Sequence, residues 1–471
     1  MKDITLQFKQ GKILPVVIKL IIPAVIAQLI SFVYNVVDRM YVSNIAGIKT
    51  QALAALGVIL PITIIVQAFA NLIGLGGSPK ASYKLGEGDR ESSNRYFNNA
   101  FSSLVLIGIV LTIVLYFFSR PIVKLFGCPD DAVQLAVDYL QIYSLGTVFI
   151  ILVLGLTPFI SAQGHSVIAM LTVLLGAVLN IILDYIFIYV CNLGIRGASL
   201  ATVLSQFCSF VWVIGFFLNN GSIFKFRIKQ MIPNGKILGG MLFLGLSPFI
   251  MTFTESMIQI VFNICLKQST GGSDSAYTAA LTIMLSALQL ISLPLNGLGY
   301  GVAPFVSYNY GNGNSDRLTK SIRYVFGIAV GFAVVVYTAS MAFPQMYAYL
   351  FHAAPDVQEL IRSYMPLFLM GTIMFPIQMT LQNINVALGQ GKTAVILAVM
   401  RKVIILIPLC FLLSHTMGYR GVYLSEGIAD LIAGVITGIV IFTTFPRVIR
   451  KRAEECRLAN ENHATNTTTE F

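Results

Sequence analysis

A few acidic side chains lie inside segments of the chain that are otherwise strongly apolar. Asp38 lies in the apolar segment 14–43, and Asp184 lies in the segment 167–191, four residues after Asn180. Residues four apart share one face of a helix. A charged side chain in an apolar helix of membrane length is costly and usually has a function. These acids are therefore the first candidates for chemistry.

The predicted depths of these side chains bring oxygen ligands from three helices to one level. At about 1.5 Å per residue from the outer helix ends, Asp38 and Thr202 lie roughly 8 Å below the outer surface and Asp184 roughly 10 Å. Two carboxylates, an amide and a hydroxyl suit a hard cation such as Na⁺. Two neighbouring carboxylates at low dielectric constant also favour one bound proton. The alternative is a structural role, in which they bond helix to helix or reach outward.

A further acid lies near the predicted middle of the bilayer. Glu255 is in the segment 238–266, at roughly 16 Å below the outer surface. It either attracts cationic organic compounds or pairs with Arg401 or Lys402, and the sequence favours neither role.

Methionines are concentrated in the second half of the chain. Met251, Met257 and Met374 are candidates for contact with substrate, because flexible thioether side chains repack around ligands of different shape. Each of them suits gap filling or contact with lipid at least as well. The methionines are a hint of broad specificity.

Patterns typical of enzymes and of cofactor sites are incomplete. Gly391-Lys392-Thr393 looks like the end of a phosphate-binding loop, but the pattern needs glycine where the chain has Val386. None of the four histidines lies deep in a predicted helix, so the sequence predicts no histidine metal cluster. We therefore expect a protein that is not an enzyme and has no cofactor.

The composition places these residues in a membrane. Of 471 residues, 56% are hydrophobic and 11% are charged, with a mean hydropathy of +0.80, whereas soluble domains carry about 25% charged residues. The apolar runs predict an all-α membrane protein with twelve transmembrane helices. These lie at 14–43, 54–78, 98–119, 134–162, 167–191, 197–219, 238–266, 276–305, 322–346, 359–388, 394–415 and 421–444.

The chain is also duplicated. The pattern N-x-x-G-x-G-x-x-P-x-x-S-Y-x-x-G-x-G occurs at 71–88 and again at 296–313, 225 residues later. Six predicted helices fall in each repeat, so both repeats enter the membrane in the same orientation. Such a parallel duplication is typical of secondary transporters, in which two similar bundles move around a shared site.

Lysine and arginine are concentrated in the loops on one side, which predicts that both termini are cytoplasmic. The chain then divides into a cytoplasmic N-terminus (1–13), an N-lobe (14–219), a cytoplasmic linker (220–237), a C-lobe (238–445) and a cytoplasmic tail (446–471). We expect the polar tail to be disordered. The net charge of +11 belongs to loops beside an anionic leaflet and gives no reason to expect a nucleic-acid partner.

Three features together resemble the multidrug and toxic compound extrusion (MATE) family of cation-coupled exporters. They are Y-N-V-V-D at 34–38, N-x-x-x-D at 180–184 and the duplicated pattern, and the resemblance covers about residues 14–445. It implies two six-helix lobes around a V-shaped cavity, and export of amphipathic, often cationic compounds in exchange for H⁺ or Na⁺. By matching residues it implies an N-lobe cation site, with metal ligands only if Na⁺ is the coupling ion. The site residues are Asp38, Asn180, Asp184 and Thr202, with Tyr34 beside them.

The second repeat departs from the first. In the register of the duplication Asp38 corresponds to Asn263, and the acidic partner that some family members provide for the acid at Glu255 is missing. Glu426 and Asp430 lie in the last predicted helix. The sequence leaves open whether these two acids and Glu255 form a second cation site.

We therefore expect a multidrug exporter in the cell membrane that works by antiport. H⁺ or Na⁺ enters as an amphipathic or cationic organic compound leaves, and no protein partner is implied. The alternative is a flippase for a lipid-linked sugar, which would be expected to need a basic cavity for a pyrophosphate. The deep helix positions offer acids and few cations. A scaffold or sensor that transports nothing would give the buried carboxylates no task.

Overall fold

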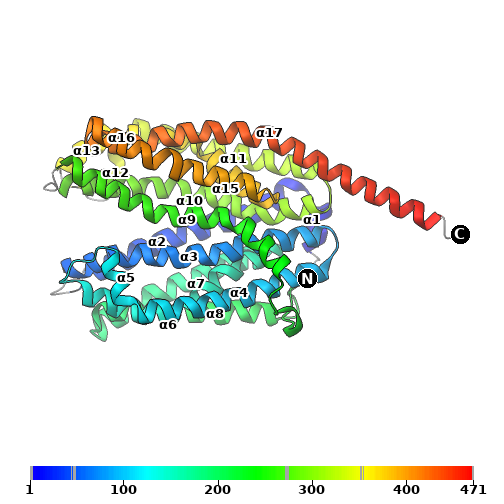
Figure 1. The fold of residues 1–471 in the computed structure, drawn as a ribbon, viewed down its shortest axis with the longest axis horizontal. Coiled ribbons are helices and arrows are strands. Elements are labelled where there is room, and N and C mark those ends of the chain that lie inside the picture. The colour runs from blue at the N-terminus through cyan, green and yellow to red at the C-terminus, as the bar shows by residue number, and fades with distance from the viewer. Residues whose placement is uncertain are drawn as a thin grey trace. The chain divides into compact units, whose positions relative to one another are not determined.

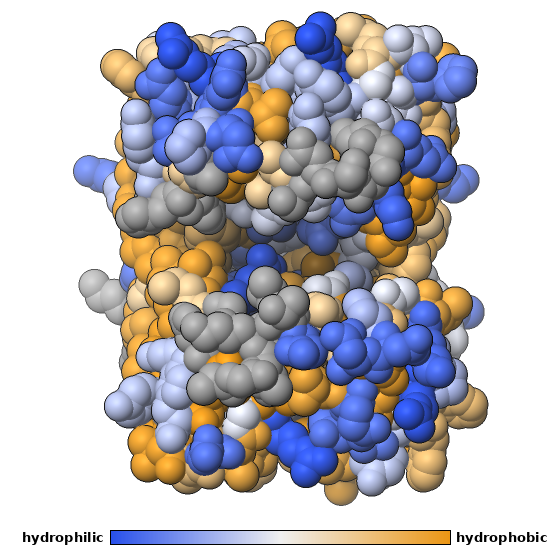
Figure 2. All heavy atoms as spheres, turned by 90° about the vertical axis from the view of Figure 1, so that its left-hand side faces the viewer, coloured by the Kyte–Doolittle hydropathy of each residue, from blue (hydrophilic) through white to orange (hydrophobic). Residues whose placement is uncertain are grey.

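The computed structural model describes residues 4–43, 45, 49–270, 275–350, 353 and 355–468. Within these residues the chain is helical and contains no strand (Figure 1). Eleven helices are long and apolar enough to cross a membrane, and the bent pair Pro355–Met374 and Pro376–Ala387, counted as one broken span, makes a twelfth. Hydrophilic side chains are frequent on the end face in Figure 2, and hydrophobic ones reach its sides. The prediction of an all-α membrane protein with twelve transmembrane helices is confirmed.

The helices of the first half of the chain follow the predicted order. They are α1 (Ile4–Gln10), α2 (Ile13–Ser43), α3 (Lys49–Gly86), α4 (Arg90–Phe117), α5 (Ser119–Leu125), α6 (Val133–Ala162), α7 (Ser166–Tyr185), the π-helical η1 (Ile186–Val190) and α8 (Gly194–Leu218). A short 3-10 turn, η2 (Ile228–Gln230), lies in the linker.

The second half repeats this order with more irregular turns. Its elements are α9 (Gly235–Thr270), α10 (Ser275–Gly311), α11 (Ser315–Ala342), α12 (Gln345–Leu350), α13 (Pro355–Leu369), η3 (Met370–Met374), η4 (Pro376–Leu381), α14 (Gln382–Ala387), α15 (Gly391–Val399), η5 (Met400–Leu406), α16 (Ile407–Met417) and α17 (Tyr419–Thr468).

The repeated pattern ends one long helix and starts the next in both halves. Gly88 and Gly313 have φ values of +84° and +69°, a backbone conformation that favours glycine. The residues that follow them, Asp89 and Asn314, cap α4 and α11. Each accepts a hydrogen bond through its side-chain oxygen from the backbone N–H three residues later, at 2.9 Å and 3.1 Å. The pattern is therefore a helix stop followed by a helix start.

Earlier glycines of the pattern allow neighbouring helices to pack closely. A Cβ on Gly74 would lie 2.7 Å from the carbonyl oxygen of Gly155, and a Cβ on Gly299 would lie 3.1 Å from that of Thr380. Both pairs occupy equivalent positions 225 residues apart. The duplication seen in the sequence is thus repeated in the packing of the helices.

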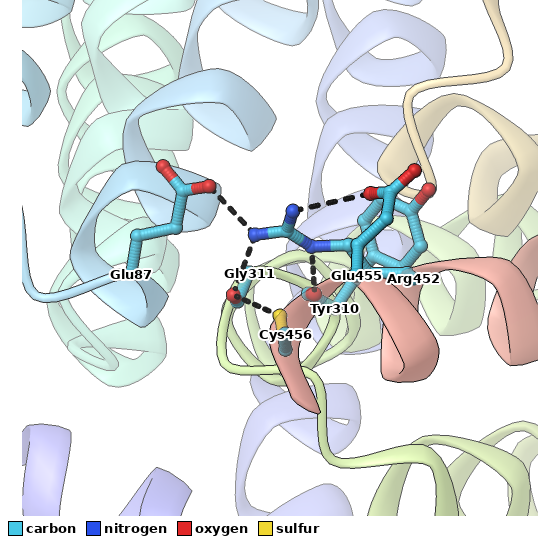
Figure 3. A network of polar contacts seen from close by, with 6 residues as sticks. All are labelled: Glu87, Tyr310, Gly311, Arg452, Glu455 and Cys456. Atoms are coloured by element: carbon cyan, nitrogen blue, oxygen red, sulfur yellow. Dashed lines mark hydrogen bonds and ion pairs between the residues drawn. The ribbon is translucent and has the colours of Figure 1, made fainter. Parts of the chain in front are cut away.

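The tail is helical, so the expectation of disorder after residue 446 is wrong for the residues described. α17 continues to Thr468, and residues good at forming helices, such as Arg, Ala, Glu and Leu, follow residue 446. Arg452 fixes the start of this extension (Figure 3). Its guanidinium donates to the carboxylate of Glu87 at 2.6 Å and to the backbone carbonyls of Tyr310 at 3.3 Å and Gly311 at 3.0 Å. Local propensity and these bonds outweigh the polar composition.

The contacts within the chain define two compact units. Unit 1 consists of Met1–Thr5, Ile26–Leu85 and Asp89–Phe253, and unit 2 consists of Leu6–Val25, Gly86–Gly88 and Thr254–Phe471. The first part of α2 therefore belongs to unit 2, and the first part of α9 belongs to unit 1. The predicted lobes at 14–219 and 238–445 stay a prediction, from which the units differ mainly at these two helices.

Candidate functional site

Three helices of unit 1 carry the predicted cation-site residues. α2 carries Tyr34 and Asp38 one turn apart, α7 carries Asn180 and Asp184 one turn apart, and α8 carries Thr202. A spacing of four residues places both members of each pair on one helix face. Asp38, Asn180, Asp184 and Thr202 are all buried. The structure brings these four side chains together, as the following distances show.

Asn180 connects the acid on its own helix to the hydroxyl on α8. With its amide oriented so that Nδ2 donates to Asp184 Oδ2 at 2.7 Å, its oxygen lies 3.3 Å from Thr202 Oγ1. The carboxyl groups of Asp184 and Asp38 lie within hydrogen-bonding reach of each other. An amide, a hydroxyl and two carboxyl groups therefore form one continuous polar cluster, which we call the unit 1 cluster.

The two acids of the unit 1 cluster have unused oxygen atoms. Asp38 Oδ1 and Asp184 Oδ1 are buried and have no hydrogen-bond partner among the described residues. Within the same part of the chain neither acid forms an ion pair, although Arg39 is the next residue after Asp38. Two buried carboxylates that face each other repel unless a proton or a cation lies between them. A bound proton or cation would therefore relieve the repulsion within the cluster.

Two tyrosines that sequence reasoning did not select complete this cluster. Tyr139 and Tyr143 lie one turn apart on α6, are buried, and have stacked rings with centroids 6.2 Å apart. Tyr34 and Tyr139 both lie close enough to Asp38 and Thr202 to interact with them electrostatically. The only signal in the sequence was that Tyr139 and Tyr364 occupy equivalent positions in the two repeats.

The acids of α17 in unit 2 are arranged differently, because each has a basic partner. Arg401 Nε lies 2.8 Å from Asp430 Oδ1, and Lys402 Nζ lies 3.4 Å from Glu426 Oε1, with all four side chains largely buried. The two basic residues are consecutive and lie in η5, a π-helical stretch of a kind often found at functional sites. Glu426 and Asp430 therefore have cations supplied by the protein itself.

Glu255 belongs to unit 2 and is exposed. Among the described residues it forms no ion pair with Arg401 or Lys402, which are paired with the α17 acids instead. Both basic residues and Glu426 still act on it electrostatically. The role of Glu255 towards a cationic compound stays a prediction.

The three methionines are not brought together within one unit. Met251 lies in unit 1, whereas Met257 and Met374 lie in unit 2 with Glu255. Met257 is exposed, and Met374 packs against α17, where a Cβ added to Gly434 would collide with its side chain. Their role in binding substrate stays a prediction.

A protein-family model matches the chain twice, once in each repeat. The family model MatE matches residues 23–186 and 248–412. Multidrug export protein MepA of Staphylococcus haemolyticus (strain JCSC1435) is 26% identical over 455 residues, which cover 96% of this chain and 99% of that protein. Multidrug export protein MepA of Staphylococcus aureus (strain MSSA476) is 26% identical over 444 residues, covering 94% and 96%.

Solved structures share the fold over nearly the whole chain. An outward-facing multidrug resistance MATE family transporter of the MOP superfamily has a TM-score of 0.87 at 23% identity, covering 95% of this chain and 99% of that one. A MOP superfamily transporter from Pyrococcus furiosus, described as having a binding pocket of reverse polarity, gives the same values.

Proposed function

We propose, from the premise that the chain belongs to the MatE family of membrane transporters and is not an enzyme, that it exports amphipathic organic compounds by antiport against H⁺ or Na⁺. Export of drugs is what the names of the staphylococcal relatives state for those proteins. The observation that supports coupling to a cation is the unit 1 cluster, where two buried acids face each other with unused oxygens.

The proposed exchange uses the repulsion within the unit 1 cluster. A proton or Na⁺ that binds between Asp38 and Asp184 removes this repulsion and lets α2 and α7 approach each other. Asn180 and Thr202 supply neutral oxygens that complete a set of ligands for Na⁺, and they hold the acids in place if the ion is a proton. Coupled exchange requires that the cation and the drug weaken each other's binding.

Unit 2 is proposed to recognise the substrate through Glu255. The carboxylate is exposed, and its two nearest basic residues are held by other acids. An organic cation near Glu255 is attracted by the charge of the carboxylate. Met257 lies two residues after Glu255 on α9 and therefore on a different face of the helix, so its contact with substrate stays a separate prediction.

The flippase alternative has less support in the side chains. A site for a pyrophosphate needs free basic groups. The buried basic residues of η5, Arg401 and Lys402, are already paired with Asp430 and Glu426. Cation-driven export of an organic compound therefore fits the described residues better.

The test is transport in a reconstituted system. The purified protein is reconstituted in vesicles, and the vesicles are loaded with a fluorescent organic cation. The movement of the dye across the membrane is followed under an imposed proton gradient and, separately, under an imposed sodium gradient. Acceleration by one gradient identifies the coupling ion. Transport that responds to neither gradient would refute the antiport proposal, and transport of a lipid-linked sugar but of no dye would favour the flippase.

We propose that both termini lie on the cytoplasmic side of the cell membrane, because the loops predicted on that side carry most of the lysine and arginine. A cysteine placed at Gln230, in a variant without the native cysteines, should react with an impermeant reagent only after the cells are permeabilised. Reaction in intact cells would reverse the orientation.

A further inference from the structure

The segment that joins α8 to α9 is held firmly against unit 1. Three asparagines of α4 each bind it through both the oxygen and the nitrogen of the side-chain amide. The oxygens of Asn94, Asn98 and Asn99 accept from the backbone N–H groups of Lys225, Arg227 and Asn234 at 2.7, 2.9 and 2.7 Å. Their nitrogens donate to Gln230 Oε1 and to the carbonyls of Lys225 and Gln230 at 2.7, 3.0 and 3.0 Å.

An aromatic contact and a helix cap add to this clamp. Phe224 is fully buried and stacks on Phe97 of α4, with ring centroids 5.4 Å apart. Asn234 Oδ1 accepts from the backbone N–H of Lys236 at 3.0 Å and so caps the start of α9. The side chains that point away from α4 are therefore presented in a fixed arrangement.

Those outward side chains are apolar and basic. Ile228 is 84% exposed and Ile232 is 72% exposed, while Arg227, Lys229 and Lys236 are exposed around them. We call these five residues the linker face. No acidic residue occurs between Asn219 and Lys236. Isoleucines held this far out of a structured segment are unfavourable in water, because their apolar area stays hydrated.

The position of the linker face in the chain indicates what covers it. The apolar spans of α8 and α9 end at Leu218 and begin at Gly235, so the segment between them lies at a membrane boundary. Leu218 is itself 66% exposed and continues the apolar surface of the span towards the linker. Apolar side chains next to lysine and arginine are typical of protein segments that lie in the headgroup region of an anionic leaflet.

We propose that the linker face is a binding site for anionic phospholipid. Ile228 and Ile232 insert between the lipids, and Arg227, Lys229 and Lys236 bind the headgroup phosphates. Each basic side chain near an anionic surface strengthens binding about fivefold. The contacts with α4 hold the linker face rigid. Because Lys236 of this face lies at the start of α9, lipid bound to the face also holds the start of that helix.

The chain has one native tryptophan, Trp212, and the experiment first removes its fluorescence. Trp212→Phe is combined with Ile228→Trp in the full chain, and the protein is reconstituted in vesicles of phosphatidylcholine with a minority of phosphatidylglycerol. In one set of vesicles the phosphatidylcholine carries bromine on its acyl chains, and in a second set the phosphatidylglycerol does. Bromine quenches the fluorescence of the introduced tryptophan on contact. We expect several-fold stronger quenching per brominated phosphatidylglycerol than per brominated phosphatidylcholine. Raised salt should reduce this preference, because it screens the charges.

Two variants test the charges. Neutralising the linker face with Arg227→Gln, Lys229→Gln and Lys236→Gln should bring the two quenching values close to equality. Removing three exposed charges elsewhere, with Arg450→Gln, Lys451→Gln and Arg457→Gln, should leave the preference unchanged. Equal quenching by both lipids in the unneutralised protein overturns the anionic preference. Absence of quenching by either lipid overturns insertion altogether and would point to a protein covering the isoleucines instead.

Discussion

The two buried acid clusters of this protein differ in where their positive charge comes from. In unit 1, Asp38 and Asp184 face each other, and among the described residues neither forms an ion pair. In unit 2, Asp430 and Glu426 are paired with Arg401 and Lys402 at 2.8 and 3.4 Å. One oxygen of each acid in both clusters is buried without a hydrogen-bond partner, so the clusters differ only in their ion pairs. A duplicated chain has thus kept one cluster that needs a cation from solution and one that contains its own.

This difference indicates that the two units have different functions. A cluster that lacks a cation can bind and release one, whereas breaking a buried ion pair leaves an uncompensated charge and is strongly unfavourable. We therefore propose that ion coupling takes place in unit 1 alone. The pairs in unit 2 are assigned to stability, which leaves the exposed Glu255 to act on the substrate.

The largest effect is expected from removing a charge in the unit 1 cluster. Asp38→Asn and Asp184→Asn keep size and most hydrogen bonding but remove the group that holds the coupling cation. Coupled exchange requires that the two ligands affect each other's binding, so without this charge gradient-driven efflux should fall close to that of protein-free vesicles at equal expression. Dye efflux from vesicles under the active gradient measures it.

A matched control for this prediction lies in the same unit. Glu91 on α4 pairs with Arg95 at 2.6 Å, and both side chains are exposed. Glu91→Gln should leave coupling intact, because surface ion pairs contribute little. Full resistance to drugs in cells that carry Asp38→Asn would contradict the coupling role and remove the contrast between the two units.

The second prediction concerns the ion pairs of unit 2. Arg401→Met leaves Asp430 buried without a partner and should lower the free energy of unfolding by about 3–5 kcal/mol. Adding Asp430→Leu removes the stranded charge and should recover most of the loss. Thermal unfolding in detergent measures both variants. If Arg401→Met is as stable as the native protein but loses its response to the ion gradient, unit 2 takes part in coupling and the assignment is wrong.

Sequence reasoning found the parts of the site that are chemically unusual for their surroundings. Acids in apolar helices are rare, so Asp38 and Asp184 could be selected from composition alone, and their helix spacing placed Asn180 beside Asp184. Tyr139 and Tyr143 could not be selected, because tyrosine is common in membrane helices and only the packing of α6 shows their position. The twelve helices were equally visible, because their lengths follow from the thickness of a bilayer.

The partners of Arg401 and Lys402 depended on tertiary structure. Sequence reasoning named only Glu255 as a partner for Arg401 or Lys402, and it considered Glu426 and Asp430 only for a second cation site. The wide turn of η5 places two consecutive basic side chains against α17, where Glu426 and Asp430 lie one turn apart. The helical tail was missed because a rule based on polarity was applied to a segment with strong helix propensity, anchored by Arg452.

A smaller and selective effect is expected at Glu255. Glu255→Gln should weaken export of cationic dyes several-fold and leave export of uncharged or zwitterionic compounds nearly unchanged, because only a cation is attracted by the carboxylate. Parallel efflux assays with both classes of compound measure the selectivity. Loss of export for every compound would place Glu255 in the coupling machinery and blur the division between the units.

The smallest effect concerns the cap that the two repeats share. Asp89 caps α4 and Asn314 caps α11, so equivalent positions hold a group that titrates and one that does not. Hydrogen bonds from Ser92 lower the pKa of the Asp89 carboxyl below its ordinary value. The charged cap therefore contributes its full stability above the pKa of the unfolded chain, and the contribution is lost as the pH falls through the lower pKa of the folded protein.

The comparison between the caps can be sharpened by making them alike. Asp89→Asn should leave stability at neutral pH nearly unchanged, because both residues are good caps, and should flatten the loss of stability in acid. Asp89→Ala and Asn314→Ala should each lower the free energy of unfolding by about 1 kcal/mol at neutral pH. In acid, Asp89→Ala should become as stable as the native protein, whereas Asn314→Ala should remain less stable. Thermal unfolding of all four proteins between neutral and strongly acidic pH measures this. If native protein and Asp89→Asn lose stability in parallel down to the lowest pH, the carboxylate form of the cap contributes nothing beyond what an amide provides.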